Sequence, residues 1–265
     1  MKLITYEEKA VINKDFGEIW NTKMARNTMI ILPIIMAVFL PAMYLIMIYF
    51  LPSEKMNGVE EMLKLIPNEL SYLSIQQSMF YIMSNLVCPM FFLMIPLMAS
   101  SVSAACSFVG EKERGTIQTL ILTPLSLKSI FKAKVIGCTI LSAIATAISF
   151  AAFTIVISIG DIILNVPFFL NWNWAVLVLV LAPAITVFGV VFMVLVSGRS
   201  KSYIESFQAS GYIVLPVIFL FIGQFTGLFQ LNAVIFLLIS LGLVIIDFLL
   251  WILAAHSFTP EKLLR

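Results

Sequence analysis

The chain has 265 residues, of which 61% are hydrophobic and 11% are charged, and its formal net charge is +2. A soluble domain of this length needs far more polar surface to cover so apolar a core, whereas a lipid bilayer accepts an apolar exterior. The near balance of 16 basic and 14 acidic residues gives no sign of a nucleic-acid partner. The composition therefore indicates an all-α polytopic membrane protein whose main partner is the lipid bilayer.

The first 27 residues predict an amphipathic helix that precedes the first membrane span. Apolar side chains recur at helical spacing within a segment that carries most of the nearby charge. These side chains are Ile12, Phe16, Ile19 and Trp20. Such a helix would lie in the membrane interface, with its tryptophan near the headgroups. The alternative is a solvated helix with no partner.

Uncharged apolar runs then predict six transmembrane helices, because about 20 such residues cross a bilayer. Pro33 and Pro41 fall inside the first run and are expected to kink it. Trp172 and Trp174 are expected to mark a membrane interface at the start of the fourth span. The predicted spans are 28–51, 79–109, 135–160, 174–196, 208–229 and 232–255.

Lysine and arginine are distributed very unequally between the two sides of these spans. If both termini are cytoplasmic, that side holds fourteen of these residues and the other side holds two, Lys55 and Lys64. Cytoplasmic loops of membrane proteins carry such an excess. We therefore predict that both termini are cytoplasmic and that the segment 52–78 is extracellular. The connection between the fifth and sixth spans is polar, and the sequence leaves open whether it is re-entrant or a simple turn.

Asp247 is the one ionisable residue expected well inside a span. Burying a charge in a membrane is costly, so its side chain should face the helix bundle or a wet cavity. A structural hydrogen bond or ion pair and a role in transport are both open interpretations. Asp161 and Glu205 fall in predicted loops and are expected to be solvated.

The segment 110–134 between the second and third spans is the most distinctive part of the sequence. It opens with Glu111, Lys112, Glu113, Arg114, Gly115 and Thr116. Gly115 predicts a turn after the charged residues, and Pro124 predicts the end of the short apolar segment that follows. A compact charged protrusion of this kind suits the transmission of force from a soluble partner. A basic loop that only anchors the topology is the simpler alternative.

This segment resembles the loop signature of the permease subunits of type-2 ABC exporters. The shared residues are the run Glu111 to Thr116, then Leu120, the run Thr123-Pro124-Leu125-Ser126, and Lys134. Gln118 departs from the family, which often has glutamate there. The likeness covers about 25 residues in detail, and the amphipathic N-terminal helix and six spans agree with it as architecture.

The resemblance implies that residues Glu111 to Thr116 form a coupling element that docks on a separate nucleotide-binding ATPase. ATP and Mg²⁺ would bind that partner, because this chain has no G-x-x-x-x-G-K-[ST] loop and is expected to be a transport subunit, not an enzyme. No cofactor, catalytic residue or metal site is expected here. A second copy or a similar permease would complete a dimer in the plasma membrane, as expected for a bacterial multi-pass protein.

The expected cargo is amphipathic or hydrophobic, with a peptide favoured over a lipid-linked or small hydrophobic molecule. Met90, Phe91, Phe92 and Met94 are the kind of side chains that would line a cavity between two copies. The alternative function is a secondary transporter or channel without an ATPase partner, which normally has several ionisable groups at mid-membrane. An intramembrane enzyme is a third class, but the spans lack paired acids, histidine clusters and a nucleophile with its base.

Overall fold

The computed structural model confirms the predicted all-helical membrane fold. It describes residues 5–50, 66, 70, 72–116, 119, 122–123, 125–198, 200, 202–209, 211–226 and 232–257. Within these residues, six helices are long and apolar enough to cross a membrane. Most of the predicted extracellular segment 52–78 and the centre of the connection between the last two spans lie outside the described residues.

The chain begins with a separate helix, α1 (Tyr6–Asn21), and Thr22 then leads into the first span. The spans follow, and in the described residues short π-helical segments (η) interrupt the α-helix of the first, second and fourth spans. The first span comprises α2 (Lys23–Ile34), η1 (Ile35–Phe39) and α3 (Leu40–Phe50), and the second comprises α5 (Ile75–Ile82), η4 (Met83–Val87), α6 (Cys88–Ala104), η5 (Ala105–Val109) and α7 (Gly110–Glu113). The third span is α9 (Leu127–Leu164), and the fourth comprises α10 (Trp172–Val176), η6 (Leu177–Leu181) and α11 (Ala182–Ser197). The fifth comprises α12 (Tyr203–Ala209) and α13 (Gly211–Phe225), and the sixth is α14 (Ala233–Ser257).

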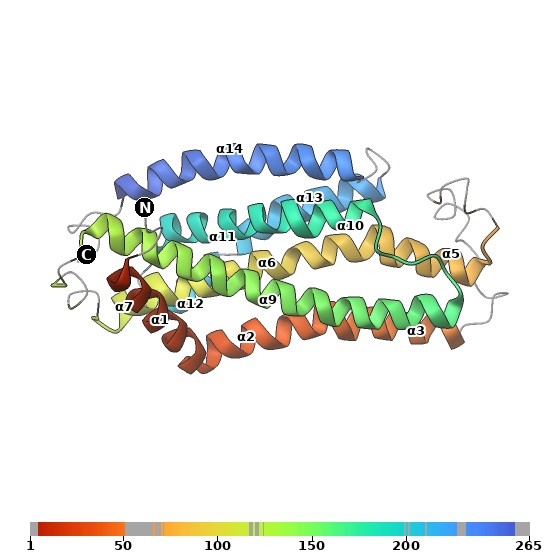
Figure 1. Cartoon of the computed structure of the whole chain (residues 1–265), viewed down its shortest axis with the longest axis horizontal. Helices are drawn as coiled ribbons and strands as arrows, with labels where there is room; N and C mark the ends of the chain where they lie inside the picture. Colours follow the sequence, from red (N-terminus) through yellow and green to blue (C-terminus); the bar gives the residue numbers. More distant parts are fainter. Residues whose placement is uncertain are drawn as a thin grey trace.

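The second and third spans are much longer than the membrane requires. They run from Ile75 to Glu113 and from Leu127 to Leu164, with 39 and 38 residues. At 1.5 Å per residue each is about 57 Å long, against a hydrocarbon core of about 30 Å. Figure 1 shows that α1, α7, the beginning of α9 and the end of α14 lie at the same end of the bundle. The surplus length at that end carries the segment that the sequence singles out.

Three of the four π-helical segments are explained by proline. The segments η1, η4 and η6 end two residues before Pro41, Pro89 and Pro183, respectively. Proline donates no backbone hydrogen bond and its ring collides with the carbonyl four residues earlier, so a wider turn relieves the strain. The segment η5 is different, because Gly110 and Glu111 follow it and no proline is near. Its cause must lie in its surroundings.

Aromatic side chains form the core at the end of the bundle away from α1. Trp174 is buried, its ring centroid lies 4.9 Å from that of Phe153 and 5.7 Å from that of Phe92, and its Nε1 donates to the carbonyl of Ser84 at 3.2 Å. The prediction that Trp174 marks the membrane interface is therefore wrong, because its one polar atom already has a buried partner. Trp172, in contrast, is 73% exposed.

Two further expectations about individual side chains are also wrong. Met90 and Phe92 are buried within the single chain, so they belong to its own core and cannot line a cavity between two copies. Asp161 is not solvated: it lies in the last turns of α9 and is 4% exposed, and its Oδ2 accepts a hydrogen bond from the backbone of Phe169 at 3.0 Å. It fixes the loop that leads into the fourth span.

Small residues let the central helices approach closely. A Cβ atom added at Gly189 of α11 would lie 2.0 Å from Oγ and 3.0 Å from Cβ of Ser100 in α6. A Cβ atom added at Gly160 of α9 would lie 2.3 Å from the ring of Phe80. Both contacts are too short for a side chain, and close approach of this kind is a main source of attraction between helices in a membrane.

We predict that Gly189→Ala destabilises the protein because α11 and α6 must separate or Ser100 must move. Overpacking of this kind costs about 1–3 kcal/mol. Gly242→Ala in α14 is the matched control, because a Cβ atom there meets nothing within 4 Å. The control should leave stability unchanged or raise it by up to about 1 kcal/mol through helix propensity. Unfolding of both variants in detergent micelles measures the difference, and equal midpoints would contradict the close packing.

Candidate functional site

Helix α1 packs against the long helix α9 through a face that includes two acidic residues. Thr5 caps the helix, and Glu8 completes the capping box by accepting from the backbone of Thr5 at 2.9 Å. The buried residues are Glu8, Val11, Asp15 and Ile19. These positions repeat at helical spacing, so they share one side of α1. The helix therefore buries carboxylates as well as apolar groups.

The apolar side chains predicted for this helix divide between two environments. Ile19 is buried, and Ile12 lies against Gly137 of α9, where an added Cβ atom would be 3.5 Å from its side chain. Phe16 and Trp20 remain about half exposed. One part of the predicted face thus contacts protein, and the other stays available to lipid, as an interfacial helix requires. The interfacial position itself stays a prediction.

Lys134, near the start of α9, is the centre of a buried polar network. Its Nζ atom lies 3.0 Å from Oε2 of Glu111 and 3.2 Å from Oδ2 of Asp15. It also donates to the carbonyl of Ser107 at 2.9 Å and contacts the Ser107 hydroxyl at 3.1 Å. The Ser107 hydroxyl in turn donates to Asp15 at 2.5 Å. We call these four residues the buried charge cluster; each is at most 2% exposed.

The cluster explains the π-helical segment that has no proline. Ser107 lies at the middle of η5, the segment just before α7. A π-helical turn interrupts the regular ladder of carbonyl acceptors and often occurs at functional sites. Here the Ser107 carbonyl accepts from the Lys134 ammonium, a bond to a charged donor that is stronger than a neutral one. The second span is therefore adapted locally to hold Lys134.

Further ion pairs lie around the cluster and link it to residues at the protein surface. Lys14 of α1 pairs with Glu111 and lies 3.6 Å from Glu18. Glu18 also accepts a hydrogen bond from the guanidinium of Arg114 at 3.0 Å. Lys132 lies 3.7 Å from Glu8 further along the same face. The N-terminal helix is thus joined to both α7 and α9 by charged side chains.

The two carboxylates of the cluster are neutralised by Lys134 together with Lys14, which lies outside the cluster, and this balance makes burial of the charges tolerable. Asp15 and Glu111 supply two negative charges, and Lys134 and Lys14 supply two positive ones. Burial raises the pKa of the Asp15 carboxyl, while the Lys134 ammonium and the Ser107 hydroxyl oppose that shift. Removing one partner from such a group lowers the free energy of unfolding strongly, because the remaining charge stays buried without a counter-ion. The intact group itself contributes much less to that free energy.

The predicted coupling residues have different positions in this arrangement. Glu111 is fully buried, so it cannot contact another protein. Arg114 lies back over the chain, where an added Cβ atom at Gly110 would be 3.2 Å from its guanidinium. Lys112 is half-buried and Glu113 is exposed. The structure therefore leaves Lys112, Glu113 and the following turn as the accessible part; docking on a partner stays a prediction.

The turn after α7 is fixed by backbone hydrogen bonds. The N–H of Thr116 donates to the carbonyl of Glu111 at 3.0 Å, and the N–H of Gly115 donates to that of Lys112 at 3.2 Å. Gly115 has φ = +71°, a left-handed conformation that glycine adopts without strain. This pair of bonds is the Schellman motif that ends many helices. The glycine that the sequence marks as a turn thus gives the exposed end of the second span a defined shape.

Three carboxylates, Asp15, Glu18 and Glu111, lie close enough together to suggest a cation site. The ammonium groups of Lys14 and Lys134 already contact this group and neutralise it. The arrangement is therefore that of an ion-pair network, and it gives no support to a metal site.

Asp247 is buried in α14, away from the residues of the cluster in the sequence. Its Oδ1 atom has no hydrogen-bond partner among the residues that the structure describes. The structure thus shows no bond that would explain this carboxyl as a purely structural group, and its role in transport stays a prediction.

Asp15, Ser107 and Lys134 were missed as a connected group by sequence reasoning. Lys134 is part of the loop resemblance, and Asp15 is one of the charges of the N-terminal segment, but nothing in either pattern pairs them. A usable signal exists: Lys134 stands directly before a long uncharged run, where an unpaired lysine would be costly. Asp15 shares a helix face with Val11 and Ile19, which indicates that its carboxyl is buried with them.

The comparisons with known proteins agree with the resemblance of the loop. The family described as "ABC-2 family transporter protein" matches residues 9–259, which is almost the whole chain. No curated protein matches it.

We predict that Lys134→Met strongly destabilises the protein, because Asp15 and Glu111 then stay buried without their shared counter-ion. Breaking a buried pair in this way costs about 3–5 kcal/mol. Lys128→Met is the matched control, since Lys128 is an exposed lysine of the same helix. Unfolding in detergent micelles should show a large loss for Lys134→Met and almost none for the control. Equal losses would show that the cluster contributes little.

Proposed function

Because the chain belongs to the ABC-2 family of transporter proteins and is a membrane permease subunit without ATPase activity of its own, we propose that it exports its cargo with energy from a separate nucleotide-binding subunit. ATP and Mg²⁺ bind that subunit. The exposed turn at Lys112 and Glu113 is the surface on which it docks. Gly115 and Thr116 hold the turn in shape, and Glu111 and Arg114 connect it to the rest of the chain.

The observation that best supports this proposal is the connection between the turn and the buried charge cluster. Lys112 and Glu113 lie at the end of a helix that runs from Ile75 without a break. Glu111, the residue before them, is joined to α1 and α9 by ion pairs. A push on the turn is therefore resisted by three helices together, and it moves them as a unit instead of bending a loose loop.

In mechanism, ATP binding draws two ATPase subunits together and displaces the turns that rest on them. The movement passes along the second span and, through Lys134, to the third. Helix α1 moves with these spans, because its Asp15 pairs with Lys134 and its Lys14 pairs with Glu111. The spans then change between states that open to the two sides of the membrane, which requires two discrete packings of the helices.

The orientation and assembly follow from the same proposal. The excess of lysine and arginine on the side of α1 and α7 supports a cytoplasmic location for both termini and for the proposed docking turn. A second copy or a similar permease completes the pathway, because one chain forms half of the transporter. The protein is then a multi-pass component of a bacterial plasma membrane.

The proposed cargo is amphipathic or hydrophobic, with a peptide favoured over a lipid-linked or small hydrophobic molecule. Many hydroxyl groups of the described spans donate to carbonyls of their own helix, which leaves them less suited to recognise a hydrophilic cargo. Of the side chains suggested from the sequence, Phe91 and Met94 remain partly accessible, although Phe91 contacts Phe221 with ring centroids 5.7 Å apart. Asp247 is the candidate for a polar contact with the cargo.

A secondary transporter or channel is the alternative. Coupling to an ion gradient would need titratable groups near the middle of the membrane. The charged residues that the structure groups together lie at one end of the bundle and are paired, which leaves Asp247 as a single candidate. The arrangement thus favours coupling to an ATPase at that end.

We predict that Glu113→Lys preserves folding but abolishes coupling to the ATPase, because it reverses a charge on the exposed turn without touching the buried cluster. Affinity purification from native membranes should recover wild-type protein with a subunit that contains a G-x-x-x-x-G-K-[ST] loop. For Glu113→Lys, this subunit should be lost, or ATP hydrolysis in proteoliposomes should fall at least tenfold, a loss of about 1.4 kcal/mol of coupling.

Glu60→Lys makes the same charge reversal in the segment predicted to face the exterior and should change neither result. An unchanged complex and unchanged ATP hydrolysis in Glu113→Lys would remove the turn as the docking surface. Transport by wild-type protein that needs an ion gradient and no ATPase would establish the alternative function.

A further inference from the structure

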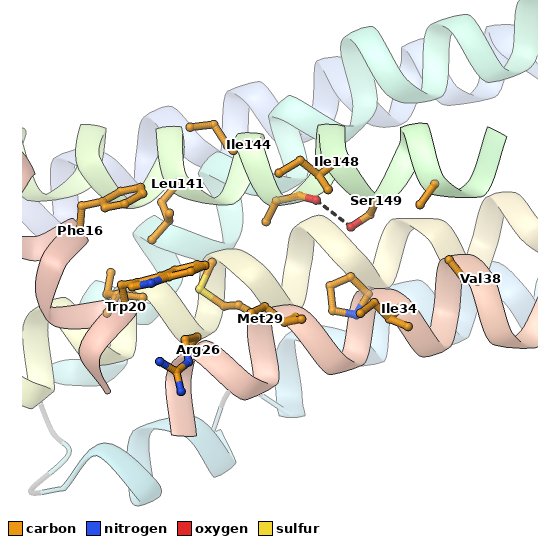
Figure 2. Close-up of a pocket in the computed structure, with 15 residues that line it drawn as sticks. Phe16, Trp20, Arg26, Met29, Ile34, Val38, Leu141, Ile144, Ile148 and Ser149 are labelled. Carbon is orange, nitrogen blue, oxygen red and sulfur yellow. Dashed lines mark hydrogen bonds between the residues drawn. The ribbon is translucent and has the colours of Figure 1, made fainter. Parts of the chain in front are cut away.

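A second site, separate from the docking turn, lies where α1 meets the first span. An apolar cavity of about 380 Å³ opens between α1, α2 and α9. Figure 2 shows Phe16, Trp20 and Arg26 at one end of this cavity and Ile34 and Val38 toward the other. We call it the elbow groove. Its lining is almost entirely hydrocarbon, with Arg26 as the only charged residue.

The length of the elbow groove corresponds to one leaflet of a bilayer. Arg26 and Val38 both line it and stand twelve residues apart on one continuous helix, a separation of about 18 Å at 1.5 Å per residue. Half of a hydrocarbon core of about 30 Å is about 15 Å. With Arg26 at the level of the headgroups, a groove of this length would reach near the middle of the membrane and would match an extended acyl chain.

Within the described part of the chain, no polar side chain that lines the inner end of the groove lacks a hydrogen-bond partner. Ser149 is the one polar side chain there, and its hydroxyl donates to the carbonyl of Ala145 at 2.7 Å. The other lining residues of α9 are alanine, leucine and isoleucine. Because this hydroxyl is satisfied within its own helix, the inner end suits a hydrocarbon tail.

The outer end carries a positive charge that the protein does not neutralise. Arg26 has no ion pair and no side-chain hydrogen bond among the described residues, and the nearest acid of α1 in the sequence, Glu18, is engaged by Lys14 and Arg114. Trp20 lies beside it, half exposed, as amphipathic aromatics do at the headgroup level. A guanidinium group binds phosphate through paired hydrogen bonds, and such bonds are strong in an environment of low dielectric.

We propose that the elbow groove binds one phospholipid with an anionic headgroup, from the leaflet on the side of α1. The phosphate pairs with Arg26, Trp20 lies at the glycerol level, and one acyl chain fills the groove along α2 and α9. The lipid then fills the space between α1 and the first span. This inference depends on the membrane location of the chain and not on the proposed ATPase coupling, so the two can fail separately.

Native mass spectrometry of the full chain, purified in mild detergent and titrated with phosphatidylglycerol or phosphatidylcholine, tests this proposal. The wild type should retain phosphatidylglycerol more tightly than phosphatidylcholine. Arg26→Gln should weaken phosphatidylglycerol binding about tenfold, as expected for the loss of a hydrogen bond to a charged group. Lys9→Gln removes the same charge from an exposed part of α1 away from the groove and should change nothing.

A second pair of variants tests the acyl chain. Ala145→Phe places a ring inside the groove and should abolish the adducts of both lipids. Ala147→Phe, on the exposed side of the same helix, should leave them unchanged. Wild-type affinity in both Arg26→Gln and Ala145→Phe would overturn the proposal. It would also be overturned if Ala145→Phe changed the monomer-to-dimer ratio with no effect on lipid, because the occupant would then be a second copy of the chain.

Discussion

The arrangement of the N-terminal half depends on one buried ammonium group. Lys134 of α9 contacts Asp15 from α1, and it contacts Glu111 and the backbone of Ser107 at the end of the second span. Three parts of the chain that are distant in sequence thus meet at a single atom. A lysine in this position is tolerable only while both carboxylates are present, and each carboxylate is tolerable only while the lysine is. Because these charges depend on one another, the cluster fixes α1 in one position against α7 and α9. Apolar packing alone would let α1 slide along α9.

The buried charge cluster relates the other features at this end of the bundle to one another. The second and third spans extend beyond the length that a membrane needs, and the cluster lies in that extension. The Schellman turn at Gly115 presents Lys112 and Glu113 on the outside, while Glu111 next to them is fixed inside. The proposed docking surface and the residue that anchors it are thus adjacent residues of one helix. Beside the buried face of α1, Phe16 and Trp20 are about half exposed and line the elbow groove.

Much of this could be predicted from the sequence, because membrane spans and turns are encoded locally. Uncharged runs predict the six helices, although the true helices at Ile75–Glu113 and Leu127–Leu164 continue through residues that hydropathy alone assigns to loops. The burial of Asp161 and Trp174 could not be predicted in the same way, and that of Asp15 is indicated only by the helix face that it shares with Val11 and Ile19. Each has at least one polar atom bound to a partner distant in sequence or in a neighbouring loop, and such partners become visible only when the helices are assembled. For the same reason Glu111 looked like a surface residue within its charged run.

The buried charge cluster joins α1 firmly to α9 and to the end of the second span, so α1 is not a loosely attached surface helix. Hydrogen–deuterium exchange of the wild-type protein tests it directly, because exchange reports local opening of each helix. We expect that the backbone amides of residues 9–21 exchange as slowly as those of residues 107–113. Rapid exchange along α1, with 107–113 still protected, would contradict it.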